Sequence, residues 1–433
     1  MPEVEQELAG IYVDSIARTL KALCEVGPRF TGTEGEARAE EAIEAEFRRA
    51  GLSPSRYPFE VRIWNCREAV LRIVRPERAE IECLPVSYTG STGGLVRGEA
   101  IFIETASPFD IAKREVKGKF GVMAGSVGGS HSPEEGSEKL RQLLFSGLKG
   151  LIMVEDRVPT SWPRAEGIPP FWFRHGTMPM VSVSFQDGLK LRKDGTEVEM
   201  LIDSSMKDIE SYNIIAEVPG SKDKDDVIVV SAHHDTVPGS IGACDNASGV
   251  AIIIELAKLF SEKKPAKTIR FISFGSEEQL SVGATSYFSK NRAEHKNIVV
   301  GINFDGVGAG IGTNEVSIIG GTELRDYVKF DLMESGYSAE VNQEVSPFSD
   351  HYPISAQGIP SIWFRGRRPN FFYHSKFDDL EHVFVEDIAE TANAVAHLIS
   401  SIDSSRVVPF SREIPAEQMR KIEHYWKELY GMV

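Results

Sequence analysis

Between residues 211 and 402, short apolar segments alternate with longer segments of helical periodicity. The strand-like segments are rich in β-branched residues and cover 212–218, 226–232, 268–274 and 297–304. The helical patterns cover 247–260, 282–291, 322–336 and 385–402, and the first of them is apolar nearly all round. Because strands that alternate with helices are typical of βαβ units, the sequence predicts an α/β fold. We expect a mixed, largely parallel central sheet flanked by helices.

The N-terminal and C-terminal regions add further helical patterns. Segments 4–26, 33–50 and 415–430 have helical spacing, and extended segments are expected at 59–64 and 69–74. The pattern at 33–50 begins with acidic residues and ends in two arginines and Gly51. This charge order suits the helix dipole, and the glycine suits a C-terminal cap.

Residues 81–204 have a different texture. Short β-like runs at 99–104, 119–125, 150–156 and 178–184 are separated by loops rich in glycine, serine and proline. One helical pattern interrupts them, near 138–145. We therefore predict a small, β-rich α/β domain at 81–204, inserted into a discontinuous domain formed by 1–80 and 205–433.

Composition narrows the class of partner. The chain has 433 residues and a formal net charge of −16, so nucleic acid and anionic membranes are poor candidates. No apolar run approaches the roughly 20 residues of a membrane span, and no signal-peptide core is visible at the N-terminus. The four cysteines form no CxxC pair. A cytoplasmic protein with free thiols is expected.

Residues that can bind metals follow several of the predicted strands. In an open α/β sheet, ligands bind at the carboxyl ends of the strands, so these side chains are expected to meet at one edge. The candidates are His233, His234 and Asp235 after 226–232, Asp245 before the helix at 247–260, Glu277 and Glu278 after 268–274, Asp305 after 297–304, and His374 beyond 359–364.

Two histidines and three carboxylates make a suitable ligand set for two divalent ions, because imidazole and carboxylate both suit zinc. One carboxylate has to bridge, since two metals about 3.5–4 Å apart share a ligand. Of the adjacent residues Glu277 and Glu278, one can bind metal while the other accepts a proton. Each motif alone is more often a helix cap or a solvated helix start. Their occurrence at successive strand ends is what favours a metal centre.

Five segments of the chain carry a resemblance to a known family. They are SAHHDTVPGSIGACDNASGV, FISFGSEEQLSVGATSYF, INFDGVG, FSDHYPISAQGIPSIW and FYHSKFDDLEHV. They resemble the co-catalytic zinc exopeptidases, a family that includes leucyl-type aminopeptidases, glutamate carboxypeptidases and glutaminyl cyclases. The resemblance is strong over 211–400, and GPRFTGTEG at 27–35 is also similar. It implies a zinc-exopeptidase fold of the phosphorylase/hydrolase-like kind. The insertion resembles a protease-associated (PA) domain.

The resemblance also implies a role for each site residue. His233 and Asp305 would hold one metal, Glu278 and His374 the other, and Asp245 would bridge them. Both metals are expected to be zinc, with cobalt or manganese as substitutes.

The remaining assignments concern catalysis. Glu277 would be the general base that accepts a proton from a water activated by the two metals. Asp235 would orient the imidazole of His233, and Tyr373 would hydrogen-bond the oxyanion.

The implied activity is hydrolysis of terminal peptide bonds, most simply by an aminopeptidase acting on peptides. The runner-up is a carboxypeptidase, because Arg365, Arg367 and Arg368 lie close to His374 in the sequence and could bind a terminal carboxylate. A glutaminyl cyclase and a non-catalytic, receptor-like protein are weaker alternatives. A homodimer is left open. The aromatic cluster of Trp162 and 171–173 is expected to form a lid or hydrophobic wall over the substrate, the insertion's own core or a dimer contact.

Overall fold

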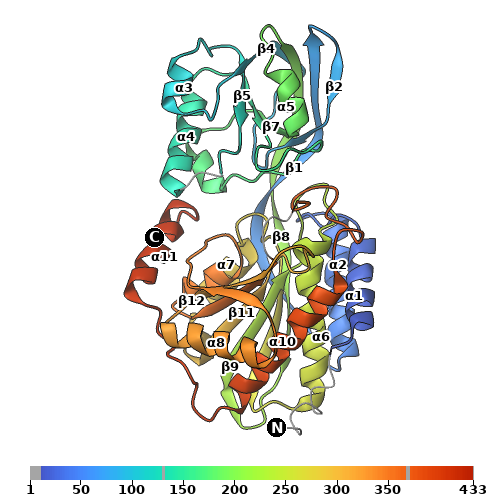
Figure 1. Cartoon of the computed structure of the whole chain (residues 1–433), viewed down its shortest axis with the longest axis vertical. Helices are drawn as coiled ribbons and strands as arrows, with labels where there is room; N and C mark the ends of the chain where they lie inside the picture. Colours follow the sequence, from blue (N-terminus) through green and yellow to red (C-terminus); the bar gives the residue numbers. More distant parts are fainter. Residues whose placement is uncertain (1–10, 129–131, 367–370, 433) are drawn as a thin grey trace. The chain divides into compact units, whose positions relative to one another are not determined.

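The computed structural model describes residues 11–128, 132–366 and 371–432. The chain forms two compact units (Figure 1). The first contains the residues up to Val61 and Glu210–His424, and the second contains Arg62–Ile209 and the residues from Tyr425 onward. Two long strands, β1 (Ser55–Arg75) and β8 (Glu197–Val218), each contribute residues to both units.

A mixed sheet forms the centre of the first unit, with strand order β13-β12-β14-β11-β9-β10-β8. Besides β8, its strands are β9 (Asp223–His233), β10 (Lys267–Phe274), β11 (Ile298–Phe304), β12 (Asn314–Ile319), β13 (Ala339–Asn342) and β14 (Ser361–Arg365). The four strands β10, β9, β11 and β14 are parallel to one another. β8 runs antiparallel to β10, and β12 runs antiparallel to β14 but parallel to β13. The predicted mixed, largely parallel sheet is confirmed.

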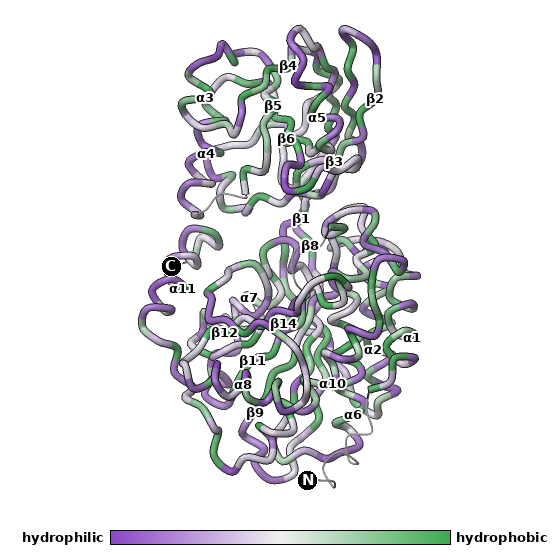
Figure 2. The backbone as a smooth tube through the Cα atoms, viewed as in Figure 1, coloured by the Kyte–Doolittle hydropathy of each residue, from purple (hydrophilic) through white to green (hydrophobic). Residues whose placement is uncertain are grey.

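Helices cover both faces of this sheet. They are α1 (Val13–Glu25), α2 (Glu34–Arg49), α6 (Ser248–Lys263), α7 (Val282–Lys290), α8 (Thr322–Glu334), α9 (His351–Ser355) and α10 (Val385–Ser404), with the 3₁₀ turn Arg292–Asn297 and the π-type turn Ala243–Ala247. A large core joins α1, α2, α6, α8 and α10 to one face, and α7 and α9 pack on the other. The strands at the middle of the unit are largely hydrophobic (Figure 2). The C-terminal helix is α11 (Ala416–Glu428).

The strand β9 shows how the sequence fits both cores. Its side chains alternate, so that Ile228 and Val230 belong to the core with α6, and Val227 and Val229 belong to the core with α7. A strand that is apolar on both faces is the pattern of a sheet covered by helices on both sides. The predicted helices within the described residues are confirmed, and the residues 4–10 of the first predicted helix lie outside them.

The second unit has its own sheet and core. Its strands are β1, β2 (Ala79–Ile81), β3 (Cys83–Pro85), β4 (Val96–Phe102), β5 (Phe120–Ala124), β6 (Gly150–Val154) and β7 (Met180–Val183). Strands β4 to β7 are parallel, and β4 also pairs antiparallel with β8. Its helical segments are α3 (Pro108–Ala112), α4 (Pro133–Phe145), α5 (Phe185–Leu191) and the 3₁₀ turn Pro170–His175.

The second unit is larger than the insertion predicted at 81–204. It begins at Arg62 because β1 continues without a break to Arg75 and pairs with β2, with Leu71 opposite Ile81. A continuous strand leaves no turn signal in the sequence at position 62. Trp172 is buried in this unit and donates from Nε1 to the carbonyl oxygen of Glu428, at 3.0 Å. None of the helices in the described part of the chain combines the length and hydrophobicity needed to span a bilayer.

Candidate metal centre

The predicted site residues meet at the carboxyl edge of the parallel strands. His233 ends β9 and lies opposite Phe274, the last residue of β10, from which the chain continues to Glu277 and Glu278. Asp305 directly follows β11, and its N–H donates to the carbonyl oxygen of Phe364 on β14. The sheet register therefore brings together residues that are far apart in the sequence.

Carboxylates surround the outer nitrogen of His233. Its Nε2 lies 3.1 Å from Oδ1 of Asp245, 3.6 Å from Oδ1 of Asp305 and 3.9 Å from Oε2 of Glu277. All these side chains come from different loops at the same sheet edge. The Oδ2 of Asp305 accepts a hydrogen bond from Ser349 at 2.6 Å, whereas its Oδ1 is the oxygen that faces His233.

His374 occupies the other side of Asp245. Its Nε2 lies 3.3 Å from Oδ2 of Asp245 and 3.1 Å from Oε2 of Glu278. One oxygen of Asp245 thus faces His233 and the other faces His374. This is the position that a bridging carboxylate takes between two metals.

The residues present fit a pair of divalent cations. Nε2 of His233 is buried and has no hydrogen-bond partner among the described residues. Four carboxylates lie around the two imidazoles, and buried like charges are costly unless a cation offsets them. Two overlapping groups of suitable ligand atoms are present, His233 with Asp245 and Glu278, and His233 with Glu277 and Asp305. The donor set of imidazole and carboxylate suits zinc.

Electrostatics at this edge favour bound protons or cations. Burial lowers the pKa of His233, but Glu277 and the other carboxylates raise it more, so it lies well above its usual value. Burial raises the pKa of Glu277 well above its usual value, and Asp305 and Asp350 act in the same direction. Burial also raises the pKa of Glu278, to about 7. The centre concentrates negative charge in a place with little water to screen it.

Asp235 connects the end of β9 to the glutamate pair. Its carboxylate accepts hydrogen bonds from the backbone N–H groups of Glu277, at 2.9 Å, and Glu278, at 3.2 Å. Nδ1 of His233 lies 3.2 Å from the backbone oxygen of Asp235 and 3.5 Å from its Oδ1. Asp235 therefore lies beside His233, and its carboxylate fixes the backbone of both glutamates. Its role in orienting His233 stays a prediction.

Asp378 supports the bridging residue and was missed by the sequence reasoning. Its carboxylate accepts from the backbone N–H of Cys244 at 2.7 Å and of Asp245 at 3.1 Å. Asp245 has non-helical backbone angles, with φ −121° and ψ 87°, and so does the next residue, Asn246. Burial raises the pKa of Asp378 to about 7. The only signal in the sequence is its place four residues after His374.

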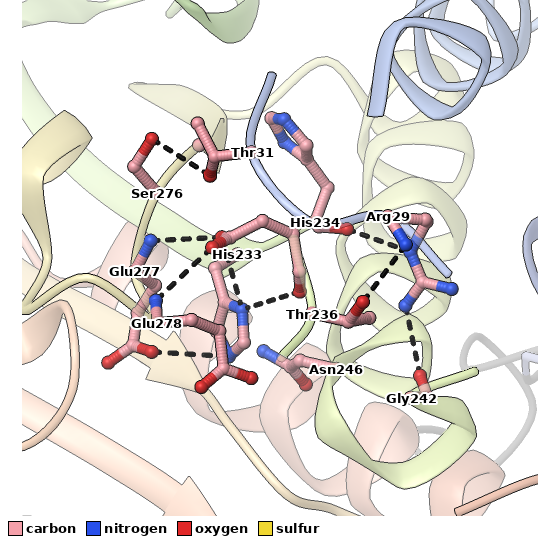
Figure 3. A network of polar contacts seen from close by, with 12 residues as sticks. Arg29, Thr31, His233, His234, Thr236, Gly242, Asn246, Ser276, Glu277 and Glu278 are labelled. Atoms are coloured by element: carbon pink, nitrogen blue, oxygen red, sulfur yellow. Dashed lines mark hydrogen bonds and ion pairs between the residues drawn. The ribbon is translucent and has the colours of Figure 1, made fainter. Parts of the chain in front are cut away.

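Arg29 is the second residue that the sequence reasoning missed. Its side chain is only 1% exposed, and its guanidinium donates to the carbonyl oxygens of His234, Ile241 and Gly242 at 2.8, 2.6 and 3.0 Å (Figure 3). Its backbone N–H donates to the hydroxyl of Thr236. Arg29 thus holds the loop between the end of β9 and the turn that carries Asp245. The motif at 27–35 was noted only as similar to the family.

Two further predicted residues can be placed. Burial raises the pKa of Tyr373 well above its usual value, and Asp245 and Glu278 add to the effect, so the phenol lies in the field of the site's carboxylates. Arg365 pairs with Glu315 at 2.7 Å and lies over the ring of Trp363. Arg367 and Arg368 lie outside the described residues.

Comparison with known proteins agrees with this geometry. Residues 213–399 match the model of peptidase family M28, a segment that contains every proposed ligand and Glu277. The curated relatives include aminopeptidase YwaD of Bacillus subtilis, 29% identical over 50% of this chain and 50% of its own length. They also include carboxypeptidase Q of Xenopus laevis, 25% identical over 63% of this chain and 61% of its own.

The chain spans less than two thirds of the length of these M28 relatives. A solved structure extends the likeness to the whole chain at the level of fold. The zinc aminopeptidase BSAP from Bacillus subtilis superimposes with a TM-score of 0.76 and 22% identity, covering 94% of this chain and 99% of its own. Both units therefore share an architecture with a solved protein.

Proposed function

We propose that this protein is a metal-dependent exopeptidase, and specifically an aminopeptidase that works with two zinc ions. The observation that carries the proposal is the position of Asp245, with one oxygen facing His233 and the other facing His374. The M28 assignment of 213–399 and the aminopeptidase names of the relatives support it. The cytoplasmic location, the homodimer and the PA-like identity of the insertion stay predictions.

The proposed ligands divide into two sets that share Asp245. His233 and Asp305 would hold one ion, and Glu278 and His374 the other. When bound, the two ions lower the pKa of water from about 15.7 toward about 7 and polarise the substrate carbonyl.

Glu277 and Tyr373 supply the proton chemistry. Glu277 takes the proton from the attacking water and passes it to the departing amine. Tyr373 keeps its phenolic proton, because its pKa is also raised, and donates a hydrogen bond to the developing oxyanion.

The pairing of Arg365 favours an N-terminal amine over a C-terminal carboxylate as the bound group. Arg365, the described candidate for binding a substrate carboxylate, is paired with Glu315 at 2.7 Å. Carboxypeptidase activity is the second candidate, and the likeness to carboxypeptidase Q favours it.

Paired substrates distinguish the two activities. We expect hydrolysis of a leucine-linked chromogenic amide, which has a free amine, and none of an N-blocked dipeptide with a free carboxylate. Chelation should abolish the activity, and re-addition of zinc, cobalt or manganese should restore it. Hydrolysis of the blocked dipeptide alone would replace the aminopeptidase with a carboxypeptidase. Full activity after exhaustive chelation would contradict both.

A further inference from the structure

A second cluster of metal-binding side chains lies on the other side of β9. One ring nitrogen of His234 and one carboxylate oxygen each from Glu36 and Glu40 lie within 4.8 Å of one another, and all three residues are buried. His233 and His234 point in opposite directions (Figure 3), because side chains alternate along a strand. Glu36 and Glu40 are four residues apart on α2, so they share one face of the helix.

His234 has the form of a metal ligand. Its Nδ1 contacts the hydroxyl of Ser273 at 3.0 Å, which orients the ring. Its Nε2 is buried and has no hydrogen-bond partner among the described residues.

The two glutamates keep acceptor capacity for a cation. Glu36 accepts from the N–H of Gly32 at 2.6 Å and from the hydroxyl of Ser211 at 2.8 Å, one donor on each oxygen. A carboxylate has about four lone-pair sites, so half of them remain. Burial raises the pKa of Glu36 to about 8, which shows that these neutral donors do not offset its charge.

Glu40 has one strong partner. Its Oε2 accepts from Nη1 of Arg56 at 2.8 Å, and the same arginine also pairs with Glu44 one turn later. One guanidinium is therefore shared by two carboxylates. Burial still raises the pKa of Glu40 to about 7. The cluster lacks positive charge at the point where the imidazole meets Glu36 and Glu40.

We propose that Glu36, Glu40 and His234 bind a divalent cation of the zinc class, separate from the dinuclear centre. One imidazole and two carboxylates form a donor set that suits zinc or manganese. The ion fastens α2 to the end of β9, directly behind His233. Arg29, in the loop that precedes α2, also contacts the end of β9, because it donates to the carbonyl oxygen of His234. The proposal does not depend on the chain being a peptidase.

Zinc content per chain tests the proposal. The chelated, full-length protein is reloaded with zinc, freed of excess by gel filtration and measured by elemental analysis. We expect Glu36→Gln and His234→Asn each to hold about one zinc equivalent less than the wild type. Glu44→Gln is the matched control, since Glu44 lies on the same helix face but outside the cluster, and it should lose none. Glu278→Gln should lower zinc content through the other centre.

Equal zinc contents for the wild type, Glu36→Gln and His234→Asn would overturn the proposal. The wild type provides a second measurement if the variants fail to fold. Zinc-edge anomalous scattering from crystals should show a peak among Glu36, Glu40 and His234. An ordered water at that position, with no anomalous signal in zinc-loaded crystals, would also overturn it. Neither result depends on peptidase activity, so the dinuclear centre is judged separately.

Discussion

His233 and His234 are neighbours in the sequence and both are fully buried, yet they have opposite electrostatic environments. The carboxylates around His233 raise its pKa well above the usual value, after the opposing effect of burial. Burial dominates at His234 and lowers its pKa to about 4. The alternation of a strand sends the two rings to opposite faces of the sheet. A His-His-Asp motif therefore reveals its chemistry only when the surroundings of each ring are known.

The largest expected effect is on kcat, and it comes from substituting the adjacent residues Glu277 and Glu278 on the His233 side. Glu277→Gln should lower kcat by about 10²–10⁴-fold while zinc content stays near normal, because it removes a proton acceptor. Glu278→Gln should lower both, because it removes a proposed ligand. Kinetics and elemental analysis on the same preparations check the pair. Normal kcat in Glu277→Gln would disprove its role as the base.

Substituting each histidine in turn tests whether His233 and His234 have different roles in activity. His233→Asn should reduce activity more than about 100-fold, since loss of a ligand costs more than loss of the groups that orient one. His234→Asn should reduce it far less, because His234 faces away from the catalytic edge. The kcat/KM of the two variants on one leucine amide is the measurement. An equal loss in both would show that the two faces act as one site.

Substituting Asp378 should have a smaller effect, on metal affinity. Asp378 holds the backbone of Cys244 and Asp245, so Asp378→Asn should weaken metal binding about 10–100-fold without removing a ligand. Competition with a zinc-binding dye measures the affinity. Asp379→Asn is a suitable control, because Asp379 contacts His382 instead. Unchanged affinity in Asp378→Asn would mean that the turn keeps its shape without this carboxylate.

A third buried histidine tests the effect of burial alone. Burial, with a contribution from Arg365, lowers the pKa of His351 to about 3, and its ring stacks on Trp363. The unfolded chain then binds more protons than the folded chain between pH 6.5 and 3, so stability falls as the pH falls through that window. In chelated protein, His351→Leu should remove a slope of up to about 1.4 kcal/mol per pH unit. Urea unfolding at several pH values measures it, and an unaltered slope would contradict this account.

Much of the fold could be predicted because the strands that carry the site are long and apolar. The strands at 226–232, 268–274 and 297–304 are buried on both faces, and their content of apolar, β-branched residues predicts that burial. The short elements β12, β13 and α9 were missed. They contain four to six residues and depend on neighbours that are distant in the sequence.

At the site, too, some residues could be predicted from the sequence and others could not. The meeting of His233, Glu278 and Asp305 could be predicted, because each follows a recognisable strand and parallel strands end at one edge. Arg29 and Asp378 could not be predicted, since they act on backbone N–H and carbonyl groups of distant segments. Backbone partners leave no pattern of residue types in a sequence. The cluster of Glu36, Glu40 and His234 was missed because helical spacing of glutamates is common on exposed helices.

The location of bound zinc tests the central claim most directly. Crystals of the zinc-loaded protein, measured on both sides of the zinc absorption edge, should show two anomalous peaks about 3.5–4 Å apart, with Asp245 between them, in addition to the peak proposed beside His234. His233 and Asp305 should lie beside one peak, and Glu278 and His374 beside the other. A single peak, or zinc bound only at positions away from Asp245, would contradict the dinuclear centre and with it the proposed mechanism.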